Sequence, residues 1–252
     1  MSKRQPIIAV LGHIDTGKTS LLDKIRGTAV QLREAGGITQ HVGASYLPIE
    51  TIQELCGNLL DRFGVKLTIP GLLIIDSPGH AVFMNLRKRA GSVCDLAVLV
   101  VDLTAGFQPQ TYEALNILKE RKTPFIIAAN KVDLIPGWKS TPTSCFLDNF
   151  KNQAREVLND LDARLYEIIG TLSTMGLQSD RFDRIKDFTR NIAIIPTSAK
   201  TGEGIAELLM VLAGLTQQYL GKKLEIAEVS GKGVILEVKE ESGLGVTADT
   251  II

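Results

Sequence analysis

The stretch that decides the fold is Gly12-His13-Ile14-Asp15-Thr16-Gly17-Lys18-Thr19. It fits the pattern G-x-x-x-x-G-K-[ST] at every fixed position, directly after the apolar run 7–11 and before a helical pattern. In such a setting the glycines let backbone N–H groups wrap phosphate oxygens at a helix N-terminus. The stretch therefore predicts a phosphate-binding loop between a buried strand and a helix over residues 18 to about 26.

Side chains of this loop predict two kinds of contact. Lys18 is expected to reach the β- and γ-phosphates of a nucleoside triphosphate, and the Thr19 hydroxyl is expected to ligate Mg²⁺. The residues that we assign to phosphate binding are Asp15, Thr16, Gly17, Lys18, Thr19 and Ser20. The alternative is a chance glycine-rich turn, which the combination of strand, spacing and Lys-Thr disfavours.

Outward from the loop, short apolar runs alternate with longer helical patterns. The further predicted strands are residues 72–76, 96–102, 125–130 and 192–196, and the further predicted helices are residues 49–63, 108–121 and 205–220. The strands are apolar on both faces, which is typical of a parallel sheet covered by helices. We therefore predict a doubly wound, mostly parallel α/β domain over residues 1–220.

Two regions extend this pattern. Residues 137–190 lie between two predicted strands, and their apolar positions indicate a helical insertion that packs on its own domain. These positions, which recur at helical spacing, are Phe150, Val157, Leu161, Leu165, Ile168 and Leu172. Residues 221–252 are expected to be a linker and a hairpin, because the turn signal Ser242-Gly243-Leu244-Gly245 separates two strand-like runs. This hairpin has no evident sheet to join, so we interpret the chain as a fragment.

Two segments fit the rest of a magnesium and γ-phosphate site. In Asp76-Ser77-Pro78-Gly79-His80, the Asp76 carboxylate follows an apolar run and can hold Mg²⁺ through water, and Gly79 can bring its N–H close to a γ-phosphate. The loop Gly36-Gly37-Ile38-Thr39 offers Thr39 as a second Mg²⁺ ligand. Each segment is a weak signal alone, and the second is equally typical of an ordinary loop.

Two later segments fit a guanine site. The Asp133 carboxylate of Asn130-Lys131-Val132-Asp133 can accept hydrogen bonds from guanine N1–H and the 2-amino group; Asn130 can brace neighbouring loops, and the Lys131 stem can lie over the purine. The backbone of Ser198-Ala199-Lys200 can donate to guanine O6. In the alternative, Asp133 and Ser198 are only helix N-caps. We predict GTP and GDP as ligands, and Asp133 disfavours an ATP-dependent enzyme.

Composition narrows the classes of protein further. Lys+Arg and Asp+Glu both number 28, so the zero formal net charge gives no electrostatic case for nucleic acid or membrane as a partner. Cys56, Cys94 and Cys145 are far apart and lack metal-ligand spacing, which indicates reduced thiols in a cytosolic protein. The apolar run near the N-terminus is too short for a signal peptide or a membrane span, so we expect a cytoplasmic protein.

With these motifs assembled, nearly the whole chain resembles a translational GTPase. The patterns G-H-x-D-x-G-K-T and D-x-P-G-H mark that group, and Arg33-Glu34-Ala35-Gly36-Gly37-Ile38-Thr39-Gln40-His41 is similar to the initiation factor two branch. The segment 116–139, the long insertion and the hairpin 233–252, with Glu237-Val238-Lys239-Glu240, are similar to the archaeal and eukaryotic member, initiation factor five B. A long charged N-terminal extension is absent, which favours the archaeal form.

This resemblance implies a P-loop GTPase that promotes the joining of ribosomal subunits and is slow without the ribosome. It implies contacts with large-subunit RNA at the subunit interface, contact with initiator tRNA through C-terminal domains absent here, a monomeric state, and a β-barrel domain that begins within residues 221–252. For catalysis, it implies that His80 positions the attacking water while Lys18 and Gly79 act on the γ-phosphate.

The resemblance also assigns roles around the catalytic histidine. Ile14 and Ile38 match apolar positions that flank it, and Asp15 matches an acidic residue that can hold a monovalent cation, K⁺ or Na⁺; in the alternative, Asp15 only accepts loop N–H groups. Thr16 stands where His is usual and Ser77 where Thr is usual, which puts a second loop histidine in doubt. The remaining alternatives are a tRNA-delivering GTPase and a nucleotide-stabilised interaction module with little turnover.

Overall fold

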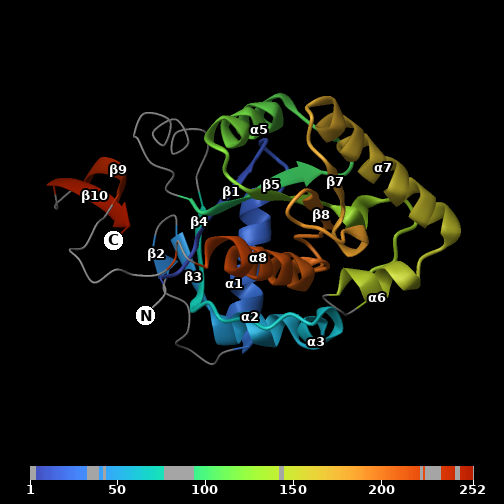
Figure 1. Cartoon of the computed structure of the whole chain (residues 1–252), viewed down its shortest axis with the longest axis horizontal. Helices are drawn as coiled ribbons and strands as arrows, with labels where there is room; N and C mark the ends of the chain where they lie inside the picture. The colour runs from blue at the N-terminus through green and yellow to red at the C-terminus, as the bar shows by residue number, and fades with distance from the viewer. Residues whose placement is uncertain are drawn as a thin grey trace.

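The computed structural model describes residues 4–32, 40–41, 44–76, 94–141, 145–221, 224, 234–241 and 245–251. Eight strands form one sheet in the order β2-β3-β4-β1-β5-β6-β8-β7 (Figure 1). Their bounds are β1 Ile7–Gly12, β2 Gln40–His41, β3 Ala44–Pro48, β4 Gly71–Asp76, β5 Leu96–Asp102, β6 Phe125–Asn130, β7 Ser179–Arg181 and β8 Ile192–Pro196. Neighbours from β4 to β7 are parallel, and the pairs β2–β3 and β3–β4 are antiparallel. The prediction of an open, mostly parallel sheet is confirmed.

Helices cover both faces of this sheet. Their bounds are α1 Lys18–Leu32, α2 Ile49–Cys56, α3 Leu59–Phe63, α5 Pro109–Arg121, α6 Phe146–Lys151, α7 Arg155–Thr174 and α8 Ile205–Leu220. Helices α5 and α7 lie on one face, and α1, α2 and α8 lie on the other (Figure 1). All seven residues of β5 are buried, because the central strand is covered twice.

Two predicted helical regions differ from the structure. The predicted helix 49–63 is two helices, because Gly57 at the end of α2 adopts φ 47°, outside the helical region, while its N–H still bonds to the Gln53 carbonyl. The insertion 137–190 is helical in α6 and α7 but also supplies β7, which pairs in parallel with β8 at the sheet edge. Within α7 the apolar positions Val157, Leu161, Leu165, Ile168 and Leu172 are buried, as their spacing predicts.

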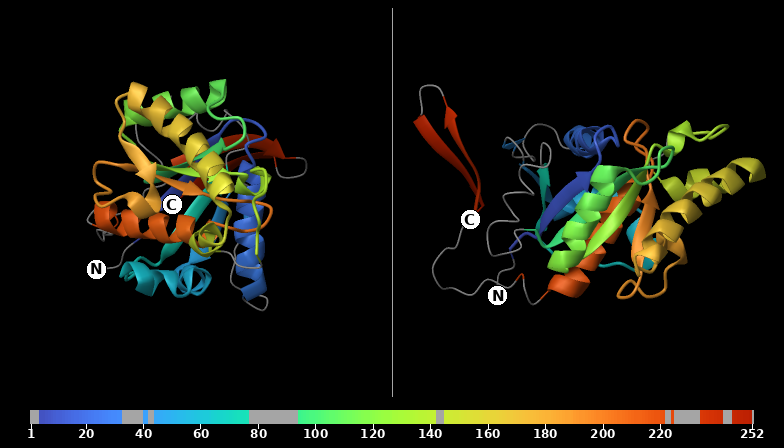
Figure 2. Two further views of the ribbon diagram at one scale, coloured as in Figure 1. Left: turned by 90° about the vertical axis from the view of Figure 1, so that its right-hand side faces the viewer. Right: turned by 90° about the horizontal axis from the view of Figure 1, so that it is seen from above.

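The hairpin that the turn signal predicts is present as β9 Val234–Glu241 and β10 Gly245–Ile251. The two strands are antiparallel and form their own two-stranded sheet, separate from the eight-stranded one. Figure 2 shows this sheet as a twisted ribbon.

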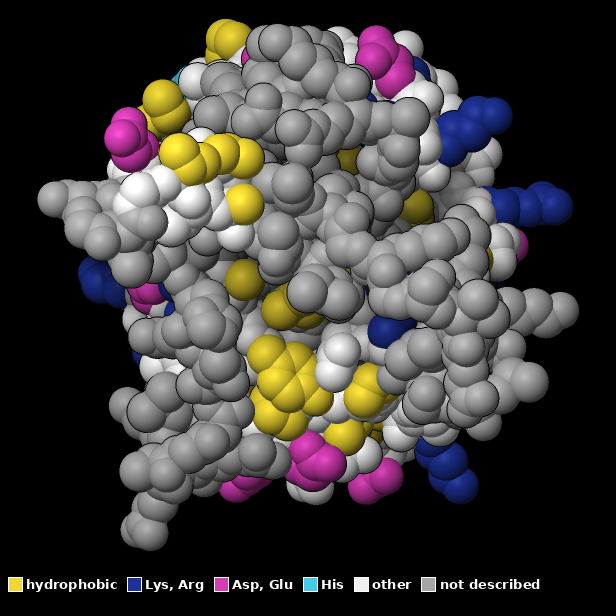
Figure 3. All heavy atoms as spheres, turned by 90° about the vertical axis from the view of Figure 1, so that its left-hand side faces the viewer, with side chains coloured by type: hydrophobic (Ala, Val, Ile, Leu, Met, Phe, Trp, Pro, Cys, Tyr) yellow, Lys and Arg dark blue, Asp and Glu magenta, His cyan; other side chains and the backbone are white. Residues whose placement is uncertain are grey.

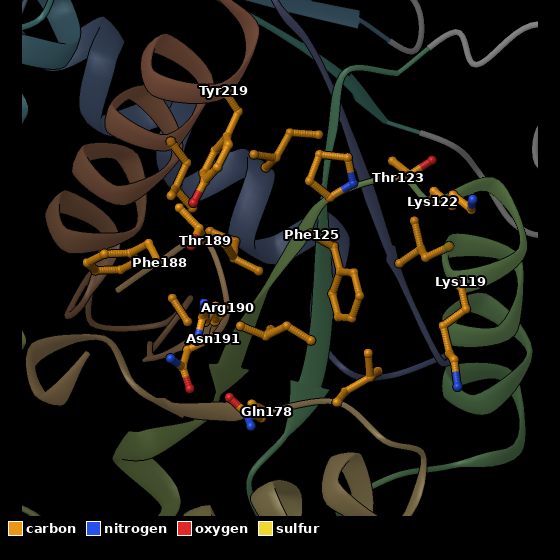
Figure 4. Close-up of a pocket in the computed structure, with 18 of the residues that line it drawn as sticks. Lys119, Lys122, Thr123, Phe125, Gln178, Phe188, Thr189, Arg190, Asn191 and Tyr219 are labelled. Atoms are coloured by element: carbon orange, nitrogen blue, oxygen red, sulfur yellow. The ribbon is translucent and has the colours of Figure 1, made fainter. Parts of the chain in front are cut away.

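The two ends of the parallel strands differ in what lies beyond them. At the end of the sheet where β5, β6 and β8 begin, a cavity of about 710 Å³ opens between the carboxyl ends of α5 and α8 (Figure 4). Those predicted nucleotide residues that the structure describes lie at the opposite end of the sheet, at or just after the carboxyl ends of the strands. Open α/β sheets bind their ligands beyond the carboxyl ends of the strands, so the functional site is expected at that end of the sheet.

Three buried thiols complete the interior. Cys56, Cys94 and Cys145 are buried, and these three thiols are not joined in a disulfide. Among the described residues, no helix is long and apolar enough to cross a membrane.

Candidate functional site

The carboxyl ends of four parallel strands, β1, β5, β6 and β8, bring distant sequence segments together. Gly12 at the end of β1 pairs with Val100 of β5, and Asp102 at the end of β5 pairs with Asn130 at the end of β6. Pro196 at the end of β8 pairs with Ala129. The phosphate-binding loop and both predicted guanine-reading segments therefore start from the same end of the sheet, at the carboxyl ends of β1, β6 and β8.

Two glycines shape the phosphate-binding loop. Gly12 has φ 147°, and a Cβ there would lie 2.3 Å from the Val100 carbonyl oxygen; Gly17 has φ 86°, and its Cβ would lie 2.4 Å from the Asn130 amide nitrogen. Real Cβ atoms do not approach other atoms so closely, so neither position accepts a side chain without a shift. The glycines let the loop fold back tightly between β1 and α1.

Hydrogen bonds to one carbonyl close the turn within this loop. The His13 carbonyl accepts bonds from the Thr16 hydroxyl at 2.9 Å and from the Lys18 ammonium. Thr16 is buried, so this residue, which departs from the family pattern, has a clear structural role in holding the turn. Asp15 has the left-handed φ of 63°, and Asp15, Thr19 and Ser20 are exposed.

The Asn130 side chain joins the phosphate-binding loop to the second guanine-reading segment. Its Nδ2 donates to the Thr16 carbonyl at 2.8 Å, and its Oδ1 accepts the Ala199 N–H at 3.0 Å. Because Asn130 is buried, these bonds are shielded from water and fix the spacing of the loops. This contact is the bracing that the sequence pattern predicts.

Asp133 and Ser198 form a direct pair. The Ser198 hydroxyl donates to Asp133 Oδ1 at 2.6 Å and accepts the Thr201 N–H at 3.0 Å. Neither residue is a helix N-cap, because Lys131 precedes the short 3-10 turn Val132–Leu134 and Gly204 precedes α8. The alternative assignment as caps is therefore wrong, and the pair instead orients one carboxylate beside the Ser198-Ala199-Lys200 loop.

Lys131 is held by an ion pair that the sequence did not reveal. The backbone of Lys131 has the left-handed φ of 71°, and the Lys131 ammonium lies 2.6 Å from Asp102 Oδ2. Burial alone would raise the pKa of Asp102, but hydrogen bonds from Lys131 and Thr104 outweigh it and hold the pKa below its ordinary value. Asp102 is therefore a charged anchor for Lys131.

Several predicted residues have no described side chain. Asp76 ends β4, where its backbone pairs with Val10 of β1, but its side chain is outside the described set. The predicted residues Ile38, Thr39, Ser77, Gly79 and His80 lie outside the described residues. Lys200 is exposed at the end of its segment.

Three residues that the sequence reading missed also shape the site. They are Asp102, Gln110, whose Oε1 accepts the Ile14 N–H at 3.0 Å, and Glu203, a buried carboxylate. Position at a strand end could have indicated Asp102, as it did Asp76. Gln110 and Glu203 act through partners distant in sequence, so no local pattern marks them.

Comparison with known proteins places this geometry in a family. Residues 3–218 match the family described as the elongation factor Tu GTP binding domain. A probable translation initiation factor IF-2 from Methanopyrus kandleri is 58% identical over 99% of this chain and 42% of its own length. Its counterpart from Ignicoccus hospitalis is 60% identical over 99% of this chain and 41% of its own length.

Solved structures agree with these relatives. The GDP-bound aIF5B from Aeropyrum pernix is 58% identical, with a TM-score of 0.93 over 98% of this chain and 42% of that chain. The apo elongation factor SelB from Methanococcus maripaludis is 23% identical, with a TM-score of 0.57 over 98% of this chain and 42% of that chain, and shares the fold. The chain thus spans about two fifths of the length of the relatives it matches.

Proposed function

We propose that this chain, which belongs to the family of elongation factor Tu GTP-binding domains, binds GTP with Mg²⁺ and hydrolyses it as the switch domain of a translation initiation factor. The observation that carries this proposal is the Asn130 amide, which ties Thr16 of the phosphate-binding loop to Ala199 of the base-reading loop. One buried side chain thereby sets the distance between a phosphate site and a guanine site. The IF-2 and aIF5B names of the relatives at 58% identity support the role in initiation.

The phosphate-binding loop fits a triphosphate with Mg²⁺. The exposed Thr19 hydroxyl is a hard oxygen ligand at the start of α1, where the helix dipole favours negative charge. Asp76, at the end of the strand beside β1, and Thr39 are the further ligands that we assign from the sequence. When bound, Mg²⁺ neutralises charge on the β- and γ-phosphate oxygens.

Guanine recognition falls to two segments. Asp133, oriented by Ser198, accepts from N1–H and the 2-amino group, and the Lys131 stem covers the purine face while its ammonium stays on Asp102. Because the Ala199 N–H is already donated to Asn130, we assign the Lys200 N–H as the donor to guanine O6. Adenine lacks all three of these groups in matching form.

For hydrolysis, Lys18 stabilises charge on the γ-phosphate, Gly79 senses that group, and His80 orients the attacking water. Asp15, exposed in the loop with a left-handed backbone, holds a monovalent cation, K⁺ or Na⁺, that offsets its repulsion of the phosphates. Residues 1–220 act as the GTPase domain, and residues 221–252 begin a β-barrel domain.

The partner that we propose is the ribosome, in the cytoplasm. The factor acts as a monomer, contacts large-subunit RNA at the subunit interface, promotes subunit joining, and reaches initiator tRNA through parts of the protein beyond this chain. A tRNA-delivering GTPase would share the same nucleotide site but would bind aminoacylated tRNA as cargo.

Hydrolysis of GTP by the complete protein, with and without ribosomal subunits, tests this function. GTPases of this mechanism turn over at roughly 10⁻⁴ per second alone and gain as much as about 10⁵-fold from a partner. We expect Mg²⁺-dependent hydrolysis that is slow alone and rises steeply when both subunits are present. Hydrolysis that ribosomal subunits leave unchanged would contradict the proposal, and tight GTP binding without turnover under any condition would favour an interaction module.

A further inference from the structure

Glu203 is a fully buried carboxylate on the loop that follows the guanine-reading segment. Its exposed fraction is 0%, and it lies between Lys200 and the start of α8. A charge taken out of water is costly unless hydrogen-bond donors surround it. The donors that surround Glu203 therefore indicate what this residue holds in place.

Four side chains donate to this carboxylate. Trp138 Nε1 donates to Oε1 at 3.1 Å, Thr201 Oγ1 donates to Oε2 at 3.0 Å, and Ser140 Oγ and Asn149 Nδ2 donate as well. Trp138, Ser140 and Asn149 come from the start of the insertion and from α6, between 54 and 65 residues away in sequence. The carboxylate thus joins the insertion to the base-reading loop.

The main chain of Glu203 continues this connection to the base-reading residues. Its carbonyl accepts the Ser198 N–H at 2.9 Å, and the Gly202 N–H donates to the Ser198 carbonyl at 2.9 Å. Gly204 makes the reversal into α8 possible, because with φ 75° a Cβ there would lie 2.0 Å from the Pro196 carbonyl oxygen. A shift of Glu203 would therefore move Ser198, the residue that orients Asp133.

The insertion offers this carboxylate a rigid anchor. The Trp138 ring stacks on Phe146 with 5.9 Å between centroids and 1° between planes. The Gln153 amide accepts the Lys139 N–H at 2.8 Å and donates to the Lys139 carbonyl at 2.7 Å. Gln153 thus holds the backbone of Lys139, which lies between the two donors Trp138 and Ser140.

We propose that Glu203 is a positioning residue through which the insertion holds the guanine-reading loop in place and so sets the affinity for guanine nucleotides. This inference rests on the proposed guanine recognition by Asp133 and Lys200. Without the carboxylate, the loop would have to give up the bonds to Trp138, Ser140 and Asn149, and the N–H aimed at guanine O6 would lose its fixed direction.

The test compares Glu203→Ala with Glu207→Ala, a matched truncation of another fully buried glutamate, one that contacts Cys145 and Leu147 rather than the base-reading loop. Affinities are measured for GDP, for 6-thio-GDP, in which sulfur weakens the bond accepted at position 6, and for IDP, which lacks the 2-amino group. Thermal unfolding of each variant checks that it is folded.

We expect Glu203→Ala to weaken GDP binding by about tenfold or more, and Glu207→Ala to leave it near the wild-type value. In Glu203→Ala the preference for GDP over 6-thio-GDP should shrink towards one, whereas the preference over IDP, which Asp133 reads, should shrink less. Glu203→Gln should bind at an intermediate level, because the hydroxyls of Ser140 and Thr201 can rotate to accept from the amide. Equal losses in both truncations with an unchanged 6-thio preference would overturn the inference.

Trp138→Phe decides the question if Glu203→Ala does not fold. This variant removes one donor to Glu203 and keeps the stacked ring, so it should weaken GDP binding and reduce the 6-thio preference; wild-type values for both would overturn the inference. Asp133→Asn separates this result from a failure of the proposed function. If Asp133→Asn binds GDP normally, guanine recognition itself is misassigned, whereas normal binding by the Glu203 and Trp138 variants alone rejects only the inference.

Discussion

Side-chain pairs at the site show how single residues are oriented by partners far away in the chain. The Ser198 hydroxyl reaches Asp133 across 65 positions, and Asp102 holds Lys131 across the end of the neighbouring strand. A carboxylate fixed in this way loses little side-chain entropy when it accepts two further hydrogen bonds. Base selectivity should therefore concentrate on Asp133.

Asp133→Asn should exchange guanine for xanthine selectivity. The new Oδ1 can keep the bond from Ser198, which leaves Nδ2 to meet the base, where it would face the 2-amino donor of guanine but the 2-oxo acceptor of xanthine. We expect GTP affinity to fall about a hundredfold and affinity for xanthosine triphosphate to rise, as measured by nucleotide titration. Asp61→Asn, on an exposed helix, is the control. Unchanged GTP binding by Asp133→Asn would refute the assignment.

At the scale of single residues, the sequence predicts those whose role follows from a local pattern. Gly12 and Gly17 belong to a fixed spacing, and the structure shows the contacts that exclude a side chain at both. Glu203 has no such pattern, because its donors lie on a segment whose fold cannot be derived from the residues around Glu203. Buried polar networks depend on tertiary contacts, so sequence patterns alone miss them.

Among the elements, long apolar runs are predicted to the residue and short polar ones are missed. The bounds of β5, β6 and β8 agree with the predicted strands, because continuous apolar character marks a strand buried on both faces. The edge strand β7 is three residues long and reads Ser-Asp-Arg, so its sequence carries no strand signal. The antiparallel β3 reads Ala-Ser-Tyr-Leu-Pro, so it lacks the continuous apolar character that marks the central strands.

Glu203 lies in the loop before helix α8, and the helix itself carries another buried carboxylate, Glu207. Burial raises the pKa of Glu207 above its ordinary value, and bonds from the Cys145 thiol and the Leu147 N–H offset this only in part. Burial and the Glu207 charge raise the pKa of Cys56 and of Cys145 to about 12, so both thiols stay protonated at neutral pH. The charge of Glu207 is thus a cost to the folded state.

This cost predicts a pH dependence of stability. Since the folded state holds the Glu207 proton more tightly than the unfolded state, the contribution of Glu207 to the free energy of unfolding falls as pH rises from about 4.3 towards the raised pKa. Glu207→Gln cannot ionise, so its stability relative to wild type should increase across that range, as measured by urea unfolding at several pH values. Glu156→Gln, at an exposed position, is the control substitution. A difference between wild type and Glu207→Gln that stays constant with pH would contradict this assignment.

For the molecule as a whole, the numbers of positive and negative charges are balanced, since Lys+Arg and Asp+Glu both number 28. On the face drawn in Figure 3, the described Lys and Arg side chains lie apart from one another, with Asp and Glu side chains elsewhere on the same face. The zero formal net charge and the spread of charge on this face therefore give no case for a broad attraction to nucleic acid there. The contact with ribosomal RNA that we propose would then depend on particular loops, which suits a trigger rather than a permanent attachment.

The carboxyl ends of β4 and β1 indicate where a partner that triggers hydrolysis would act. Strand β4 ends at Asp76 beside Val10 of β1, so the segment that follows β4 leaves the sheet next to the strand that leads into the phosphate-binding loop. Ile14, 61% exposed in that loop, presents an apolar side chain at the same edge. Under the proposed function, contact with a partner would favour the arrangement in which His80 orients the attacking water beside the γ-phosphate.

His80→Ala should therefore separate binding from hydrolysis. We expect GTP affinity near that of the wild type, because the bonds to phosphate and base come from other residues, and a fall of about a hundredfold or more in ribosome-stimulated hydrolysis, the order expected for a group that orients water or transfers a proton. Single-turnover hydrolysis on ribosomes with prebound GTP measures this directly, and Lys18→Ala, which should lose GTP binding itself, marks the opposite outcome. A whole partner-induced gain of about 10⁵-fold amounts to about 7 kcal/mol of barrier, more than one side chain supplies, so under the proposed function the ribosome would act on further groups besides His80. Wild-type hydrolysis by His80→Ala on ribosomes would assign the water to another group.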